Sequence, residues 1–193
     1  MLGRLLKRLF GRSPAGPGGW RPYEPVSELT DLQIRQALTQ DGLSHGRPAD
    51  IDFVRRAIGG NQFAQGLDLR RHGTPAPAEK LRELGVRTNA ILSLEYLETL
   101  TAKGLSDPIG AAQFITSACH EQLAGVNRRE RYAHAGVSHV QVIPNSMAAG
   151  PCPACLALAE KPIPAEDAPD GPLPGCPHPS QCRLFTRAVM DFE

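Results

Sequence analysis

The stretch DPIGAAQFITSACHEQLAGVNRRERYAHAG, residues 107–136, decides the fold of this chain. It begins with Asp107-Pro108, a helix-capping residue followed by the imino acid that favours the first helical position. It ends at Gly136, which suits the left-handed conformation that often follows a helix. Its apolar residues recur at helical spacing along one face: Ala112, Ile115, Cys119, Leu123 and Val126. We therefore predict one long helix from Asp107 to Ala135, buried along one side.

On the N-terminal side of this helix, glycine and proline separate several shorter helical segments. Capping signals and apolar spacing predict helices at Thr30–Gln40, from Pro48 to Gly59, from Pro77 to Gly85 and from Thr88 to Gly104. The basic triplet Arg70, Arg71 and His72 is expected on a solvated loop.

On the C-terminal side, the chain changes character. The β-branched stretch Val137–Ile143 predicts a strand, and Cys182–Val189 predicts a final short strand. The expected fold is mainly α: a helical body, residues 26–135, followed by a small zinc-bound β-hairpin module of treble-clef or ribbon-like type, residues 136–193. A Gly/Pro linker, residues 13–25, precedes the body.

The overall composition excludes several classes of protein. The chain has 193 residues, of which 41% are hydrophobic and 21% charged, with a formal net charge of +1. Extensive disorder requires lower hydrophobicity and a larger net charge. A dedicated nucleic-acid binder carries a strongly basic surface, so the balance of charges argues against nucleic acid as a partner. No apolar run is long enough to predict a transmembrane helix.

The first twelve residues, MLGRLLKRLFGR, form a basic amphipathic pattern. One helical face carries Leu2, Leu5, Leu6, Leu9 and Phe10, and the rest carries Arg4, Lys7, Arg8 and Arg12. Such a helix can dock into a partner protein's groove or lie on an anionic membrane, and a frayed terminal helix is the third interpretation. The segment lacks a small-residue cleavage site, so we expect no secretory signal.

Four of the five cysteines, Cys152, Cys155, Cys176 and Cys182, are spaced as C-x2-C-x20-C-x5-C. An odd cysteine count without a secretory signal argues against a disulfide framework and for a reducing cytoplasm. Zinc prefers four such donors in a tetrahedron. The intervening loop PIPAEDAPDGPLPG, residues 162–175, contains too few apolar residues to pack a core. We predict a Zn²⁺ site formed by these four cysteines, with His178 as the substitute for Cys176. A redox dithiol at Cys152 and Cys155 is the alternative.

From about residue 118 to residue 186 the order of features resembles the C-terminal part of phage head-morphogenesis proteins, the Mu F-like minor capsid group. The matching residues are Glu121, Asn127, Gly136-Val137, Cys152-x-x-Cys155, Leu158, Lys161, Pro172-Leu173-Pro174, His178-Pro179 and Cys182-Arg183. The resemblance implies a zinc-stabilised β-hairpin module attached to a helical region. The chain departs from the family pattern at Leu184, where the family has another cysteine. A cellular protein that shares the module is the other interpretation.

A catalytic interpretation rests on different residues. Zinc-dependent nucleoside and base deaminases combine a [HC]-x-E motif with P-C-x-x-C, and this chain has Cys119-His120-Glu121 and Pro151-Cys152-Pro153-Ala154-Cys155. Cys119, Cys152 and Cys155 would then bind zinc, and Glu121 would transfer the proton. Against this, Cys119 lies on the apolar stripe of a predicted helix, where a buried cysteine acts as a small hydrophobic residue.

A cluster of cations, Arg128, Arg129 and Arg131, lies near the end of the long helix and suits its C-terminal dipole, with phosphate binding as the alternative. From all these patterns we predict a non-enzymatic binding or assembly protein with a structural zinc. We expect a protein partner, and a location in the cytoplasm or peripherally at a membrane through residues 1–12.

Overall fold

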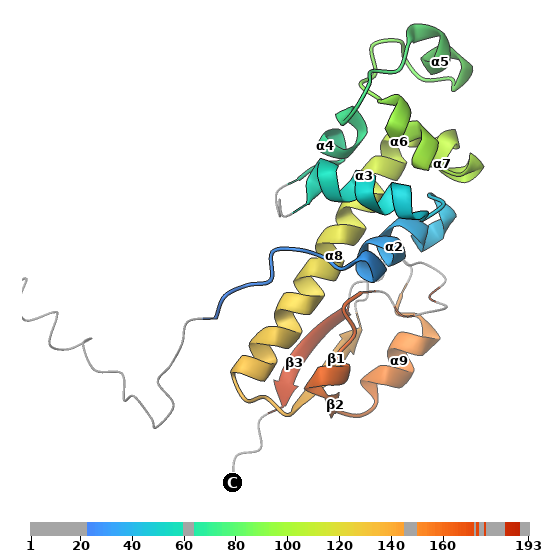
Figure 1. The fold of residues 1–193 in the computed structure, drawn as a ribbon. Helices are drawn as coiled ribbons and strands as arrows, with labels where there is room; N and C mark the ends of the chain where they lie inside the picture. The colour runs from blue at the N-terminus through green and yellow to red at the C-terminus, as the bar shows by residue number, and fades with distance from the viewer. Residues whose placement is uncertain are drawn as a thin grey trace, which may run out of the picture.

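The structure, a computed structural model, describes residues 23–59, 64–144, 150–171, 173, 176 and 184–189. One long helix, α8 (Pro108–His134), runs from a group of short helices at one end of the molecule to a small sheet at the other (Figure 1). The described residues confirm the mainly α prediction. The predicted N-terminal helix and most of the predicted linker fall on residues 1–22, outside the described part of the chain.

The short helices before α8 follow the local signals of the sequence. They are α2 (Asp31–Thr39), the 3-10 turn η1 (Gln40–Gly42), α3 (Pro48–Ile58), α4 (Gly66–Arg71), α5 (Ala78–Glu83), α6 (Leu94–Thr99) and α7 (Ala102–Ser106). At the start of α2, the backbone N–H of Gln33 donates to the Thr30 hydroxyl, and the Thr30 N–H donates to the Gln33 side chain at 2.9 Å. At the start of α8, the Gly110 N–H donates to Asp107 Oδ1 at 2.9 Å.

The helix predicted from Thr88 to Gly104 is wrong as a single element. Helix begins only at Leu94, and the structure divides the rest of this segment into α6 and α7, which meet at an extended Leu100. The reason is a contact that is distant in sequence: the His45 N–H donates to the Thr99 carbonyl, and the Thr101 N–H donates to the Leu43 carbonyl at 3.0 Å. These bonds hold the chain extended at this point, and Thr101 then caps α7.

The loop predicted at Arg70, Arg71 and His72 is also corrected. Arg70 and Arg71 belong to α4, and His72 follows as its C-terminal cap. The helix forms because Leu69 is completely buried against the body. Gly66 begins α4 in such close contact with α8 that a Cβ atom there would lie 2.7 Å from the Gln113 backbone nitrogen.

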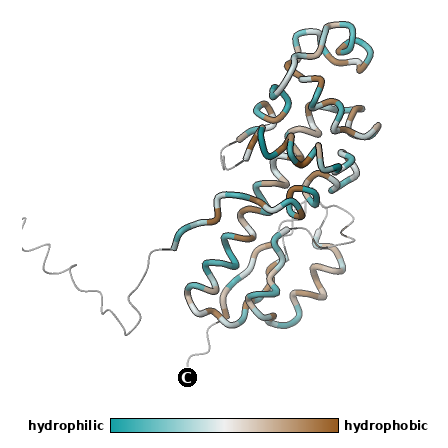
Figure 2. The backbone as a smooth tube through the Cα atoms, in the orientation of Figure 1, coloured by the Kyte–Doolittle hydropathy of each residue, from teal (hydrophilic) through white to brown (hydrophobic). Residues whose placement is uncertain are grey.

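The core of the body lies between α8 and the short helices. Its largest fully buried side chains include Leu38, Ile51, Leu69, Tyr96 and Ile115. The Tyr96 hydroxyl satisfies its donor inside this core by donating to the Pro108 carbonyl at 2.7 Å. Hydrophobic and hydrophilic residues alternate along the helices of the body, as helices with one buried face require (Figure 2).

At the other end, the described strands form a three-stranded antiparallel sheet instead of a two-stranded hairpin. The elements are β1 (His139–Pro144), α9 (Pro153–Ala159), β2 (Ile163–Pro164), η2 (Ala165–Asp167) and β3 (Leu184–Val189), with strand order β2-β1-β3. In the central pair, Val142 lies opposite Thr186. The final strand was predicted from Cys182, but residues 182 and 183 lie outside the described residues.

The C-terminal half of α8 forms the wall against which this sheet packs. The Tyr132 hydroxyl donates to the Thr186 carbonyl of β3 at 2.8 Å, and Tyr132 packs against Val140 and its neighbours. Along the described ranges, none of the helices combines the length and apolar character needed to cross a membrane.

Candidate functional site

The Cys152-x-x-Cys155 pair lies where α9 begins. Cys152 has the extended backbone of a helix N-cap, and the Cys155 N–H donates to its sulfur at 3.4 Å. Pro153 occupies the first helical position, which its fixed φ favours. This turn directs both side chains to the same side, and the two sulfur atoms lie 3.1 Å apart. Both cysteines are buried, with Cys155 only 2% exposed.

The surroundings of Cys152 favour its thiolate. The Cys155 thiol contributes most to lowering the pKa of the Cys152 thiol, and the Cys155 backbone N–H follows. The Cys176 side chain and the Ala154 backbone N–H act in the same direction, and burial opposes them. A thiolate is the form that binds metals and attacks disulfides.

A small hydrophobic cluster encloses the pair. Val142 of β1 and Leu184 of β3 are buried with the two cysteines, and Leu158, Ile163, Leu173 and Cys176 pack around them. The turn that brings in Cys176 is fixed by its own N–H, which donates to the Leu173 carbonyl at 3.1 Å. Three of the four predicted zinc ligands thus belong to one cluster.

The described residues do not form the predicted zinc site. They contain no group of three or more His, Cys, Asp or Glu side chains that could hold a metal ion. The predicted ligand Cys182 and His178, the predicted substitute for Cys176, lie outside the described residues. Zn–S bonds of about 2.3 Å in a tetrahedron place two sulfurs about 3.8 Å apart. The Cys152 and Cys155 sulfurs, at 3.1 Å, would have to separate by several tenths of an ångström.

The residues of the deaminase interpretation are not brought together. Cys119 lies in the middle of α8, 4% exposed, within the core of the helical body. Cys152 and Cys155 belong to the separate cluster beside the sheet. Burial also raises the pKa of the Cys119 thiol to about 12, which keeps it protonated. Cys119 is therefore a core residue, as its place on the apolar stripe predicts.

The arginines near the end of α8 have different environments. Arg131 lies in the last turn, where its charge suits the helix dipole as predicted. Arg129 instead forms an ion pair with Asp170, with 2.6 Å between nitrogen and oxygen. Asp170 is largely buried, and this burial raises the pKa of its carboxyl although Arg129 and Arg128 both act to lower it. Arg129 thus joins α8 to the loop that leads to Cys176.

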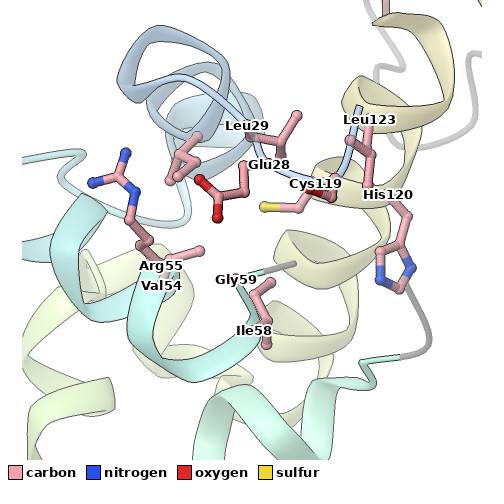
Figure 3. A pocket seen from close by; sticks show the side chains of 11 residues that line it. Glu28, Leu29, Val54, Arg55, Ile58, Gly59, Cys119, His120 and Leu123 are labelled. Carbon is pink, nitrogen blue, oxygen red and sulfur yellow. The ribbon is translucent and has the colours of Figure 1, made fainter. Parts of the chain in front are cut away.

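A feature that sequence reasoning missed is a cavity of about 160 Å³ in the helical body. Its lining includes Ser27, Glu28, Leu29, Ile34, Val54, Arg55, Ile58, Gly59, Cys119, His120 and Leu123. Figure 3 shows the Cys119 sulfur and the Glu28 carboxylate directed toward the space, whereas the His120 ring points away from it. Because the lining comes from three distant segments, no local pattern could have predicted it.

Comparison of the chain with protein-family models, with curated proteins and with solved structures found no match.

Proposed function

We propose that this chain is a non-enzymatic binding or assembly protein whose C-terminal module is held together by a structural zinc ion. The ligands are Cys152, Cys155, Cys176 and Cys182, with His178 as the substitute for Cys176. The observation that carries the proposal is the buried pair of Cys152 and Cys155 sulfurs, 3.1 Å apart, in a cluster that Cys176 also joins. When bound, zinc would cross-link segments that have little apolar surface with which to pack.

The chain connectivity supports Cys182 as the fourth ligand. Leu184 is buried in the same cluster as Cys152 and Cys155, and Cys182 precedes it by two residues. Two residues span at most about 7 Å, so a ligand at position 182 is within reach of the cluster. Its contribution would complete a four-ligand site without an open position for substrate, which is why the proposed zinc is structural and not catalytic.

The biological role follows from two features of the sequence. The resemblance of residues 118–186 to the Mu F-like minor capsid group supports a role in assembly, of a phage head in that family. The basic amphipathic pattern of residues 1–12 supports contact with a protein partner, with an anionic membrane surface as the alternative. Removal of residues 1–12 should abolish binding to vesicles that contain anionic lipid, and unchanged binding would remove the membrane contact from the proposal.

Zinc content is the test of the central claim. We expect one zinc per chain in the wild type and in Cys119→Ala, and loss of zinc in Cys182→Ala. Cys119→Ala is the matched control because it removes a buried cysteine from the other core. His178→Ala and Cys176→Ala then identify the remaining ligand. Loss of zinc in Cys119→Ala alone would contradict the proposal and favour the catalytic site.

A redox dithiol is the second candidate function, and the lowered pKa of Cys152 beside the Cys155 thiol favours it. The two thiols would form a disulfide and pass two electrons and two protons to a disulfide acceptor, which becomes two thiols. Absence of zinc from all these proteins, with reversible oxidation of the pair by a small disulfide, would support this function in place of the structural zinc.

A further inference from the structure

The cavity of the helical body has no part in the proposed zinc module. Most of its wall is apolar, made by Leu29, Ile34, Val54, Ile58 and Leu123. Sites for small-molecule ligands usually enclose about 300–1,000 Å³. A cavity of about 160 Å³ has room for one large apolar side chain of a protein segment rather than for a nucleoside or a cofactor.

The segment that precedes α2 leads directly to this cavity. The Tyr23 hydroxyl donates to the Asn127 side chain of α8 at 2.6 Å, and Asn127 also bonds the backbone of Val26 in both directions. Ser27, Glu28 and Leu29 then line the cavity. Asn127 lies eight residues along α8 from Cys119, a rise of about 12 Å. The anchor at Tyr23 thus lies about 12 Å along α8 from the level of Cys119, so the tether before it has only a short distance to span.

The length of the preceding chain suits a return to the cavity. Residues 13–22 are rich in glycine and proline and separate the amphipathic segment from the anchored Tyr23. A flexible chain of ten residues has a root-mean-square span of about 17 Å. That span covers the rise along α8, and a short tether holds its segment at an effective concentration in the millimolar range.

The chemistry of the two surfaces is complementary once Arg55 is accounted for, because this cation of the lining is paired with Asp31. Residues 1–12 carry a stripe of leucines and Phe10, any one of which has the size and polarity to fill the cavity. Glu24 and Glu28, both exposed, lie on the segment that borders the opening, and the Glu28 carboxylate is directed toward the space (Figure 3). Four cations in residues 1–12 would face these acids.

We propose that residues 1–12 bind back to the cavity as an amphipathic helix and insert one apolar side chain between α2, α3 and α8. The inference depends on the amphipathic segment in the proposed function, but it is independent of zinc. Its consequence is that the segment masks itself, because the leucine stripe cannot be buried in the cavity and on a membrane or partner at once.

Limited trypsin digestion of the full chain tests the docking. Docking should protect Arg4, Lys7 and Arg8 from cleavage. Ser27→Trp places an indole at the opening from an exposed position, and Leu5→Asp puts a charge on the apolar stripe. We expect cleavage about tenfold faster in both variants than in the wild type. Ser106→Trp, an exposed serine on α7 away from the cavity, is the matched control and should cleave like the wild type.

Equal cleavage rates in all four proteins would overturn the docking. Protection that grows with protein concentration would also overturn it, because a second copy would then supply the segment. Binding to vesicles of phosphatidylglycerol and phosphatidylcholine separates this inference from the proposed membrane contact. With docking, Ser27→Trp should bind the vesicles about tenfold more tightly than the wild type. Equal binding and equal cleavage would remove the docking and leave the membrane contact standing.

Discussion

The two ends of this molecule differ in how they bury hydrophobic side chains. The helical body buries a continuous cluster of large apolar side chains, from Ile34 on α2 to Cys119 on α8. Among its described residues, the C-terminal module has two small clusters instead, one around Val142 and Leu184 and one around Val140. Two of the buried residues of the first small cluster are cysteines. The described body combines many apolar side chains in one core, whereas the described part of the module pairs a small apolar cluster with Cys152 and Cys155.

The largest effect should come from removing zinc from the module. Under the proposed function, a chelator should reduce amide-exchange protection in β1 and β3 by about a hundredfold or more, because structural zinc contributes roughly 10–16 kcal/mol in small modules. Protection in α3 and in the first half of α8 should be retained. Cys182→Ala serves as the control, since the chelator should change nothing further in it. Unchanged protection in the wild-type sheet would contradict the difference between the two ends.

The converse test weakens the helical body by removing part of a buried side chain. Ile115 is completely buried on α8, so Ile115→Ala should lower the free energy of unfolding by about 2–5 kcal/mol, measured by thermal or denaturant unfolding. Zinc should remain bound at one per chain. Leu32→Ala removes a leucine that is 64% exposed and should change stability by less than about 0.5 kcal/mol. If Ile115→Ala unfolded the body and released zinc in the same transition, the two ends would unfold as one unit.

We expect the smallest of the three changes from a substitution at the contact between the helical body and the C-terminal module. Gly125→Ala would ordinarily stabilise a helix by about 1 kcal/mol. Here the added Cβ would lie 2.2 Å from the Asp170 carbonyl oxygen, so we expect a net loss of about 1–3 kcal/mol in denaturant unfolding. The neighbouring exposed Ala124→Gly should cost about 1 kcal/mol through helix propensity alone. Stabilisation by Gly125→Ala would mean that the Asp170 loop does not pack closely on α8.

Sequence reasoning succeeded where the determining contacts are local. The capping box of Thr30 and the Asp107-Pro108 start predicted α2 and α8, because each signal acts within one turn of helix. The turn that brings Cys152 and Cys155 together is local in the same sense. For these elements a few neighbouring residues contain all the information that is needed.

It failed where distant segments decide the conformation. The break between α6 and α7 depends on backbone bonds from Leu43 and His45, about 55 residues earlier in the chain. Helix α4 exists because Leu69 is buried and Gly66 packs against α8. The cavity combines segments from α3, α8 and the approach to α2. None of these partners can be identified from a single sequence without the fold.

The length of α8 has a mechanical consequence. Its 27 residues extend for about 40 Å, with the first half inside the body and the second half behind the sheet. A continuous helix resists bending, so the body and the module share one axis and keep a fixed angle to each other. A partner that grips the sheet therefore also sets the direction in which the other end of the molecule points. In an assembly of many copies, that property would convert a local contact into a defined orientation for each subunit.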